Sequence, residues 1–287
     1  FPTSTSVTRV PYPYPYRPAF GTAESCGRDA VRFIEEQIFT TVSPPELTAG
    51  ILVESIQSDA GVIVPPPDFM PALRALCDKY DLMLIDDEVK VGMGRTGRMW
   101  ACQLTDTDPD IMIIGKGVAS GMSMSATVAP AEILDVLAAG HAFTTAGAPA
   151  ACAAAIATLD VVRDEKLADN ARAQGDFIMD GIREMSSRHR LIGEVRGAGL
   201  IIGVELVLDP VTKKPASKEC AKLVLRCQQL GLLVHYVGIF SHVIELTPPL
   251  VLTRAEATAG LEIFDRALTD VEEGRVADSE LDAVSGW

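Results

Sequence analysis

The stretch Leu84–Arg98, L-I-D-D-E-V-K-V-G-M-G-R-T-G-R, decides the fold because an apolar run ends there in three consecutive acids. The run Asp81–Val89 predicts a buried strand, and nearly continuous apolar strands are typical of parallel sheets that are covered on both faces. A loop that only reverses the chain needs no cluster of carboxylates. The acids therefore indicate that the end of this strand belongs to a site that meets positive charge.

Segments on both sides of this strand alternate between helical and strand patterns. The expected elements are a helix over Cys26–Phe39, a strand over Leu47–Ile56, a helix over Met70–Tyr80 and a strand over Asp110–Ile114. Such alternation predicts an α/β fold with a mostly parallel sheet. Ligands of these sheets bind beyond the carboxyl ends of the strands, which is where Glu54, Asp87 and Lys116 fall.

The second half of the chain predicts a smaller domain of the α+β class, with long helices and shorter strands. The expected helices begin at Ala148 and span Leu167–Arg188, Glu219–Leu230 and Glu256–Leu268, and the strands lie within Leu191–Val207, Leu232–Tyr236 and Val243–Leu246. We therefore expect a Pro-rich extended segment over residues 1–20, a large domain over 21–164 and a small C-terminal domain over 165–287.

Composition argues against several classes of function. The 287 residues contain 25 Lys and Arg against 39 Asp and Glu, a net charge of −14, whereas nucleic-acid binding requires a basic face. The longest weakly polar run, Ala146–Leu159, is too short to span a bilayer, and no charged-then-apolar leader is visible, so we expect a cytoplasmic protein without a membrane partner. The six cysteines have no C-x-x-C spacing, which predicts reduced thiols and no metal site.

A carboxylate after one strand and a lysine after the next are compatible with one specific chemistry among several. A lysine amine forms a Schiff base with an aldehyde cofactor, and a nearby acid can keep the ring nitrogen of that cofactor protonated. Asp87 fits the acid and Lys116 fits the lysine. The residues alone leave alternatives open, because Asp87 and Glu88 could equally form a charge pair at a helix N-terminus.

Five segments together resemble the class III aminotransferase family of pyridoxal-phosphate (PLP) enzymes. They are I85-D-D-E-V-K-V-G-M-G-R-T-G-R-M, P109-D-I-M-I-I-G-K-G, F143-T-T-A-G-A-P-A-A-C-A-A-A-I-A-T-L, V195-R-G-A-G-L and T247-P-P-L. The resemblance implies the large domain of a fold type I PLP enzyme, incomplete here, followed by the small domain. It also implies a homodimer that acts on a small-molecule substrate.

The resemblance assigns four residues to the cofactor. Asp87 matches the acid that pairs with the pyridine nitrogen, and Lys116 matches the Schiff-base lysine. Val89 matches the apolar residue packed on the ring, and Thr144 matches the threonine that binds the cofactor phosphate across the dimer interface. These assignments are expectations that follow from the family match.

Further segments resemble the amino-acid racemase branch of this family, which includes α-amino-ε-caprolactam racemase and isoleucine 2-epimerase. They are E54-S-I-Q-S-D-A-G-V-I-V-P-P, D87-E-V-K-V-G, M124-S-A-T-V-A-P-A-E-I-L and H235-Y-V-G. This implies racemisation or epimerisation of an amino acid or amino lactam by abstraction of its α-proton. We expect Lys116 to serve one face of the substrate and Asp59 the other, with Lys90 holding the charge of Asp59. Taken alone, a lysine at a strand end such as Lys90 is more often a solvated side chain, and Asp59 could equally be a turn residue.

Departures from the family pattern bear on the substrate and on whether this chain is active. Glu245 stands before T-P-P-L, where many members have an arginine that grips a substrate carboxylate, which favours a neutral lactam, an amino amide or an amino acid held by another group. The phosphate-binding loop and ring-stacking aromatic of the family precede the part that begins at Phe1, and Ala148 replaces a usual asparagine. A transaminase that moves the amino group to a keto acid, and a non-catalytic remnant, therefore remain alternatives to the racemase.

Overall fold

The computed structural model describes residues 6–137, 140 and 143–283, and the chain folds into two compact units. Unit 1 comprises Phe1–Ile56, Val64–Met93 and Trp100–Val162, and unit 2 comprises Gln57–Ile63, Gly94–Met99 and Arg163–Trp287. The chain thus passes between the units several times. Two short segments that interrupt unit 1 in the sequence, 57–63 and 94–99, belong to unit 2.

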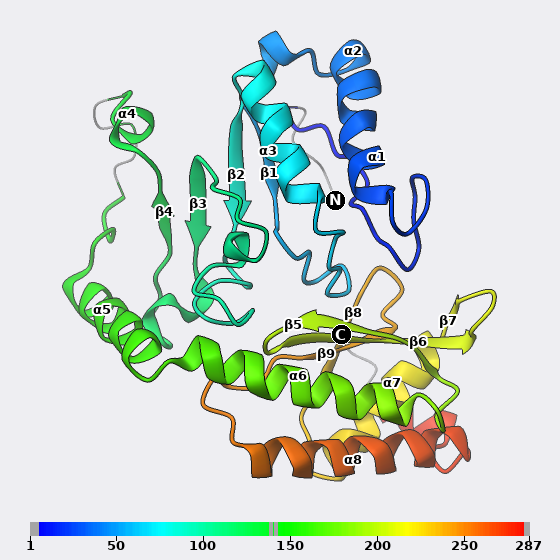
Figure 1. The fold of residues 1–287 in the computed structure, drawn as a ribbon. Helices are drawn as coiled ribbons and strands as arrows, with labels where there is room; N and C mark the ends of the chain where they lie inside the picture. Colours follow the sequence, from blue (N-terminus) through cyan, green and yellow to red (C-terminus); the bar gives the residue numbers. More distant parts are fainter. Residues whose placement is uncertain (1–5, 138–139, 141–142, 284–287) are drawn as a thin grey trace. The chain divides into compact units, whose positions relative to one another are not determined.

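Unit 1 is built on a four-stranded sheet in the order β1-β2-β3-β4 (Figure 1). β1 (Gly50–Val53), β2 (Met83–Asp87) and β3 (Ile111–Ile114) run parallel, and β4 (Ala126–Val128) pairs antiparallel with β3. The predicted mostly parallel sheet is therefore confirmed. Because β1, β2 and β3 point the same way, their carboxyl ends meet at one edge of the sheet.

Helices cover one face of this sheet. α1 (Cys26–Phe33) continues through a π-helical turn, Ile34–Ile38, into α2 (Phe39–Thr41), and α3 (Phe69–Tyr80) connects β1 to β2. The apolar sides of these helices pack against alternate strand residues. The buried members of this core are Ala30, Val31, Ile34, Phe39, Val53, Phe69, Met70, Leu73, Leu76, Cys77, Leu82 and Leu84.

The opposite face of the sheet is more open. Side chains alternate along β2, so Leu84 and Asp86 share the helix side while Ile85 and Asp87 lie on the other. On that other face Leu52 is 62% exposed, and Ile85 and Asp87 are half-buried. The remaining helical elements of unit 1 are η2 (Pro45–Leu47), η3 (Ala101–Leu104), η4 (Lys116–Ala119), α4 (Ala131–Leu134) and most of α5 (Pro149–Asp164).

Unit 2 has the expected α+β architecture. Its antiparallel sheet has the order β5-β6-β9-β8, with the short β7 beside β6. The strands are β5 (Ile192–Ala198), β6 (Ile201–Asp209), β7 (Lys214–Pro215), β8 (His235–Val237) and β9 (Val243–Leu246). The helical elements are α6 (Leu167–Met185), α7 (Ser217–Gln229), α8 (Arg254–Glu272) and η5 (Asp278–Ala283).

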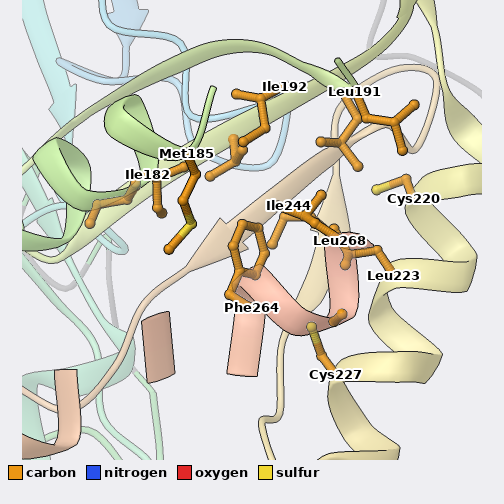
Figure 2. Close-up of a cluster of buried hydrophobic side chains, with 14 of the residues drawn as sticks. Ile182, Met185, Leu191, Ile192, Cys220, Leu223, Cys227, Ile244, Phe264 and Leu268 are labelled. Carbon is orange, nitrogen blue, oxygen red and sulfur yellow. The ribbon is translucent and has the colours of Figure 1, made fainter. Parts of the chain in front are cut away.

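The three long helices of unit 2 and one face of its sheet enclose an apolar core (Figure 2). Phe264 of α8 and Ile182 of α6 contribute to it, together with Leu223 of α7 and Ile244 of β9. Full burial of each such side chain contributes roughly 1.5–3 kcal/mol. Within the described ranges, no helix combines the length and apolar character that crossing a bilayer requires.

The other face of the unit 2 sheet is polar. Along β6, Ile202, Val204 and Leu206 enter the core, so the intervening Gly203 and Glu205 lie on the opposite side. On β9, Glu245 pairs with Gly203 and shares that side. Segment 57–63 packs here, because a Cβ on Gly203 would lie only 2.9 Å from Cβ of Val62.

Candidate active site

The carboxyl edge of the unit 1 sheet carries the charged residues singled out in the sequence. Glu54 follows β1 directly, Asp87 is the last residue of β2, and Lys116 comes two residues after β3. In the register of the sheet Asp87 is opposite Ile113, three residues before Lys116. The fold therefore brings the ends of these strands together at the place where ligands of parallel sheets bind.

The carboxylate of Asp87 is oriented by the backbone that follows it. Its Oδ1 accepts a hydrogen bond from the N–H of Val89 at 3.0 Å. Asp87 lies on the open face of the sheet and is half-buried. A carboxylate held in this way can stabilise a cationic group placed beside it.

Val89 packs against the residue that precedes Lys116. A Cβ built on Gly115 would lie 3.3 Å from Cγ1 of Val89, so glycine at this position allows the close approach. The Val89 side chain is half-buried. Val89, Asp87 and the start of η4 are thus joined by one hydrogen bond and one packing contact.

Lys116 begins η4 in an unusual backbone conformation. Its φ is +46°, in the left-handed region that costs most residues about 1 kcal/mol or more. Strain of this kind is typical of functional positions. The Lys116 side chain is exposed and lines a hollow of about 1220 Å³. Residues around this hollow include the hydroxyl-bearing Ser123, Ser125, Thr127 and Thr145.

Thr144 lies in an exposed turn beside the same hollow. Its neighbours Phe143 and Thr145 line the hollow, as do Gly147 and Ala148, which directly precede α5. Thr144 is itself exposed on this turn. The structure therefore brings Lys116 and the turn that carries Thr144 to a common cavity of unit 1.

Asp59 and Lys90, the two remaining sequence candidates, belong to different units. Lys90 lies in the turn after β2 in unit 1 and is half-buried. Asp59 is exposed on segment 57–63, which belongs to unit 2. The interaction expected between Lys90 and Asp59 therefore stays a prediction.

Two acids flank Asp87, and the sequence did not predict that both would be buried. Asp86 is 0% exposed and Glu88 is 1% exposed, on the side of β2 opposite Asp87. Asp86 accepts hydrogen bonds from the Ser55 N–H at 3.1 Å and from the Ser55 hydroxyl at 2.8 Å. Oε1 of Glu88 accepts from the Cys102 N–H at 2.9 Å, and its Oε2 has no hydrogen-bond partner among the described residues.

The acid pair favours a shared proton. Burial, and after it the charge of Glu88, raises the pKa of Asp86 to about 8. Burial also raises the pKa of Glu88. The orphaned oxygen of Glu88 and the raised pKa values have one common explanation, because a proton held between two buried carboxyl groups satisfies one oxygen and removes one charge.

Glu245 is buried on the polar face of the unit 2 sheet. Its Oε2 lies 3.7 Å from Nε2 of His235. Burial lowers the pKa of the Arg95 guanidinium, and the charge of Glu245 partly offsets this effect. Arg95 donates hydrogen bonds to the carbonyls of Leu200 at 3.0 Å and Pro248 at 2.5 Å, so it fixes backbone in unit 2.

The residues of unit 1 fit a PLP cofactor. The set comprises the Lys116 amine on a strained turn beside a large hollow, the oriented Asp87 carboxylate on the neighbouring strand, and the apolar Val89 side chain, which packs next to Gly115. Serine and threonine hydroxyls around the hollow are suitable donors to phosphate oxygens. Lys116, Asp87 and Val89 would hold such a group at the carboxyl edge of the sheet.

Known proteins with similar sequences match along nearly the whole chain. The family model described as aminotransferase class-III matches residues 1–268. An alanine/serine racemase of Pyrococcus horikoshii is 39% identical over 280 residues, which are 96% of this chain and 59% of the relative. An isoleucine 2-epimerase of Lentilactobacillus buchneri is 37% identical over 290 residues, covering 100% of this chain and 64% of the relative.

A solved structure agrees with the sequence relatives. The PLP-bound form of an amine transaminase from an uncultivated Pseudomonas species matches with a TM-score of 0.85 and 33% identity. The match covers 91% of this chain and 61% of that one. The chain therefore spans between 59% and 64% of the length of the relatives and the structural neighbour named here.

Proposed function

This chain belongs to the class III aminotransferase family of PLP enzymes, and we propose that the whole protein racemises or epimerises an amino acid or an amino lactam. The observation that carries the proposal is the carboxyl edge of the unit 1 sheet, where Asp87 and Lys116 follow neighbouring strands. The likeness to an alanine/serine racemase and to an isoleucine 2-epimerase supports racemisation over transamination.

In this proposal three residues of unit 1 hold the cofactor. When bound, PLP draws electron density from the α-carbon of the substrate and so acidifies its α-proton. The Lys116 amine would hold the cofactor through its aldehyde. The Asp87 carboxylate, held by the Val89 N–H, would favour the protonated form of the ring nitrogen by its charge, and the Val89 side chain would supply an apolar contact to the ring.

Racemisation needs a proton carrier on each face of the substrate. The Lys116 amine, once released by the substrate, takes the α-proton from one face or returns it there. The Asp59 carboxylate does the same on the other face, so each turnover removes one proton and delivers one. Lys90 keeps Asp59 charged and correctly hydrated. These roles follow the match of Asp59 and Lys90 to the racemase branch.

The whole protein is proposed to act as a homodimer in the cytoplasm. Thr144 would bind the cofactor phosphate of the partner subunit, which is the role of the matching threonine in the family. Its place on an exposed turn at the start of α5 supports this role, because an exposed hydroxyl is accessible to a second subunit. The composition supports neither a nucleic-acid nor a membrane partner.

The proposed substrate is an amino acid or an amino lactam. Glu245 occupies the position where many family members have a carboxylate-binding arginine, and its buried negative charge would repel a carboxylate placed there. This favours a neutral amino lactam or amide, or an amino acid whose carboxylate is held elsewhere. The names of the two relatives, which specify alanine, serine and isoleucine, support an amino acid.

Incubation with PLP and one pure enantiomer, without any keto acid, tests this function. For a substrate with one stereocentre we expect the optical rotation of the solution to fall to zero while the total concentration of substrate stays constant, and for isoleucine we expect a second diastereomer to form. Candidate substrates are alanine, leucine, isoleucine and an α-amino lactam. A stoichiometric release of keto acid with retained rotation would instead support the transaminase, in line with the amine transaminase neighbour. Failure to bind PLP would support the non-catalytic remnant.

Two variants serve as controls for the racemase assay. Lys116→Ala should abolish racemisation, because the cofactor loses its covalent attachment and the substrate loses one proton carrier. Asp59→Asn should slow racemisation by about 10²-fold or more, since an amide cannot exchange a proton at neutral pH. Full activity of Asp59→Asn would remove Asp59 from the mechanism.

A further inference from the structure

Segment 57–63, which carries Asp59, is a loop closed by its own backbone. Gln57 and Ile63 exchange two backbone hydrogen bonds, of 3.0 Å from the Gln57 N–H and 2.7 Å from the Ile63 N–H. The Ser58 carbonyl accepts the N–H groups of Gly61 at 2.9 Å and Val62 at 2.7 Å. The Asp59 side chain is thereby presented at the tip of a short, defined turn.

The loop closes through strained backbone. Gly61 has a φ of +131°, and Val62, which follows it, has a φ of +51°. A positive φ at a β-branched residue is a genuine outlier that costs roughly 1–3 kcal/mol and persists only where the surroundings impose it. Val62 is 0% exposed, and the absence of a side chain on Gly203 leaves room for it.

Arg196 of β5 supplies the contacts that impose this conformation. Its Nε donates hydrogen bonds to the carbonyls of Gly61 at 3.1 Å and Val62 at 3.0 Å, and its Nη2 donates to Gly61 at 2.6 Å. The Arg196 side chain is 8% exposed. Both carbonyls at the strained corner of the loop are therefore bound by one planar guanidinium, which a lysine ammonium could not reproduce.

The guanidinium is itself fixed from the sheet side. Its Nη1 donates to Glu194 at 2.5 Å and to Glu205 at 2.7 Å. Glu205 is 0% exposed, and its second oxygen lies 3.2 Å from Nε2 of His242. A second anchor holds the loop at the candidate acid, because the Gly238 N–H donates to the Asp59 carbonyl at 2.9 Å.

We propose that Arg196 is a positioning residue for Asp59: it fixes the strained corner of segment 57–63 and thereby holds the Asp59 carboxylate in the place where it exchanges the α-proton. The inference rests on the proposed role of Asp59 in racemisation. Arg196 is buried against the loop, and its proposed role requires no contact with the substrate or the cofactor. Its effect reaches Asp59 through the two carbonyls that it binds, over three residues of tightly hydrogen-bonded backbone.

The first test measures the loop itself, without cofactor or activity. Arg196→Lys keeps the positive charge but loses the planar guanidinium that binds the two loop carbonyls. Backbone amides of segment 57–63 should therefore exchange with D₂O about 10-fold faster or more, because hydrogen bonds from a charged donor no longer stabilise the closed loop. Arg226→Lys is the matched control, because Arg226 is a partly buried arginine of unit 2 that pairs with Asp270, and it should leave this segment unchanged.

A milder variant covers the case in which Arg196→Lys fails to fold. Glu194 is partly exposed, and Glu194→Gln removes the charge of one partner of the guanidinium but none of its bonds to the loop. Exchange in segment 57–63 should then rise about threefold. If Arg196→Lys folds, unchanged amide exchange in segment 57–63 of that variant would overturn the inference. If it does not fold, unchanged exchange in Glu194→Gln would overturn it.

The second test separates positioning from a general structural role. With the whole protein loaded with PLP, each pure enantiomer is incubated in D₂O and the loss of its α-hydrogen is followed. Asp59→Asn identifies the enantiomer whose α-proton lies on the Asp59 face. Arg196→Lys should slow exchange of that enantiomer about 10-fold or more, while the other enantiomer, served by Lys116, exchanges at the rate of the unaltered protein.

The outcomes distinguish the positioning role of Arg196 from the proposed racemase function on which it rests. An equal loss for both enantiomers in Arg196→Lys would assign Arg196 a purely structural role and overturn the inference. An unaltered protein that exchanges neither enantiomer would contradict the proposed function instead, whatever the behaviour of segment 57–63. If Arg196→Lys slows exchange of the enantiomer on the Asp59 face, but slows it no further when added to Asp59→Asn, then Arg196 acts through Asp59.

Discussion

Asp86, in β2, and Glu88, directly after it, are both buried, on either side of Asp87, the residue proposed to pair with the cofactor. The pair requires a proton to remain inside the protein, because burial raises the pKa of both carboxyl groups. A buried carboxylic acid behaves as a neutral hydrogen-bonding group, whereas two adjacent buried carboxylates repel one another. The proton is therefore part of the local structure beneath Asp87.

This proton makes stability depend on pH in a definite direction. The unfolded chain loses it near pH 4, and the folded chain keeps it until the raised pKa of Asp86, about 8. Between these values the folded state binds more protons, so the free energy of unfolding contributed by this group falls as pH rises, by at most about 1.4 kcal/mol per pH unit. Above the raised pKa the contribution is lost.

Asp86→Asn should remove this dependence, because an amide resembles the protonated acid and does not titrate. We expect the variant to lose less stability than the unaltered chain between about pH 6 and about pH 8.5 in urea unfolding, by about 2–3 kcal/mol. Asp176→Asn, on the exposed face of α6, is the control. Identical losses in Asp86→Asn and the unaltered chain would show that no proton is held there.

The positions of Asp86 and Glu88 were only partly predictable from the sequence. Alternation along a strand already puts Asp86 and Glu88 on one face and Asp87 on the other. Their partners, the Ser55 hydroxyl and the Cys102 N–H, come from other parts of the chain, and no spacing in the sequence connects them. The direction of each side chain was therefore predictable, but the burial of the pair was not.

At the scale of elements, α6 approaches the turn between β5 and β6 closely enough to require glycine. A Cβ on Gly175 of α6 would lie 1.9 Å from the carbonyl oxygen of Gly199 in that turn. Backbone atoms cannot move aside as the end of a flexible side chain can. The packing of α6 on the sheet of unit 2 therefore requires a residue without a side chain at position 175.

Gly175→Ala and Gly260→Ala form a matched pair of helix substitutions. Alanine is favoured over glycine in a helix by about 0.5–1 kcal/mol, and a Cβ on Gly260 of α8 would meet only Cδ1 of Leu232 at 3.9 Å. Gly260→Ala should therefore stabilise the chain by about that amount. Gly175→Ala should destabilise it by about 2 kcal/mol or more, because the helix must shift.

Urea unfolding of both variants measures this difference directly. A stabilising effect of Gly175→Ala would contradict the close approach of α6 to Gly199. The comparison cancels the helix propensity of alanine, since both glycines lie within long helices. What remains is the cost of the clash.

The order of strands and helices was largely predictable, but segment 57–63 was not. Apolar runs and helical periodicity indicate β1, β2, β3 and the three long helices of unit 2, since each element carries its own pattern. The loop around Asp59 carries only seven residues, and its contacts are with Arg196 and Gly238, far along the chain. Its membership of unit 2 depends on those distant partners, which local patterns do not encode.

At the scale of the whole molecule, the proposed chemistry draws on both units. Lys116, Asp87 and Val89 belong to unit 1, whereas Asp59 and its clamp Arg196 belong to unit 2. In this account Arg196 bears only on the proton carrier that belongs to its own unit, Asp59.

This chain covers only part of the length of its relatives, which decides what protein an activity assay must use. The chain spans between 59% and 64% of the alanine/serine racemase, the isoleucine 2-epimerase and the amine transaminase. Experiments on turnover therefore belong with the whole protein. The residues proposed to hold the cofactor in this chain, in contrast, can be addressed one at a time.

The most direct test of the account is the identity of the lysine that binds PLP. The whole protein is mixed with PLP, reduced with borohydride and digested, and the peptides are analysed by mass spectrometry. We expect a phosphopyridoxyl group on Lys116, and none on the exposed control Lys79, which pairs with Glu35. An unlabelled Lys116 in the folded whole protein, with or without label on another lysine, would contradict the account.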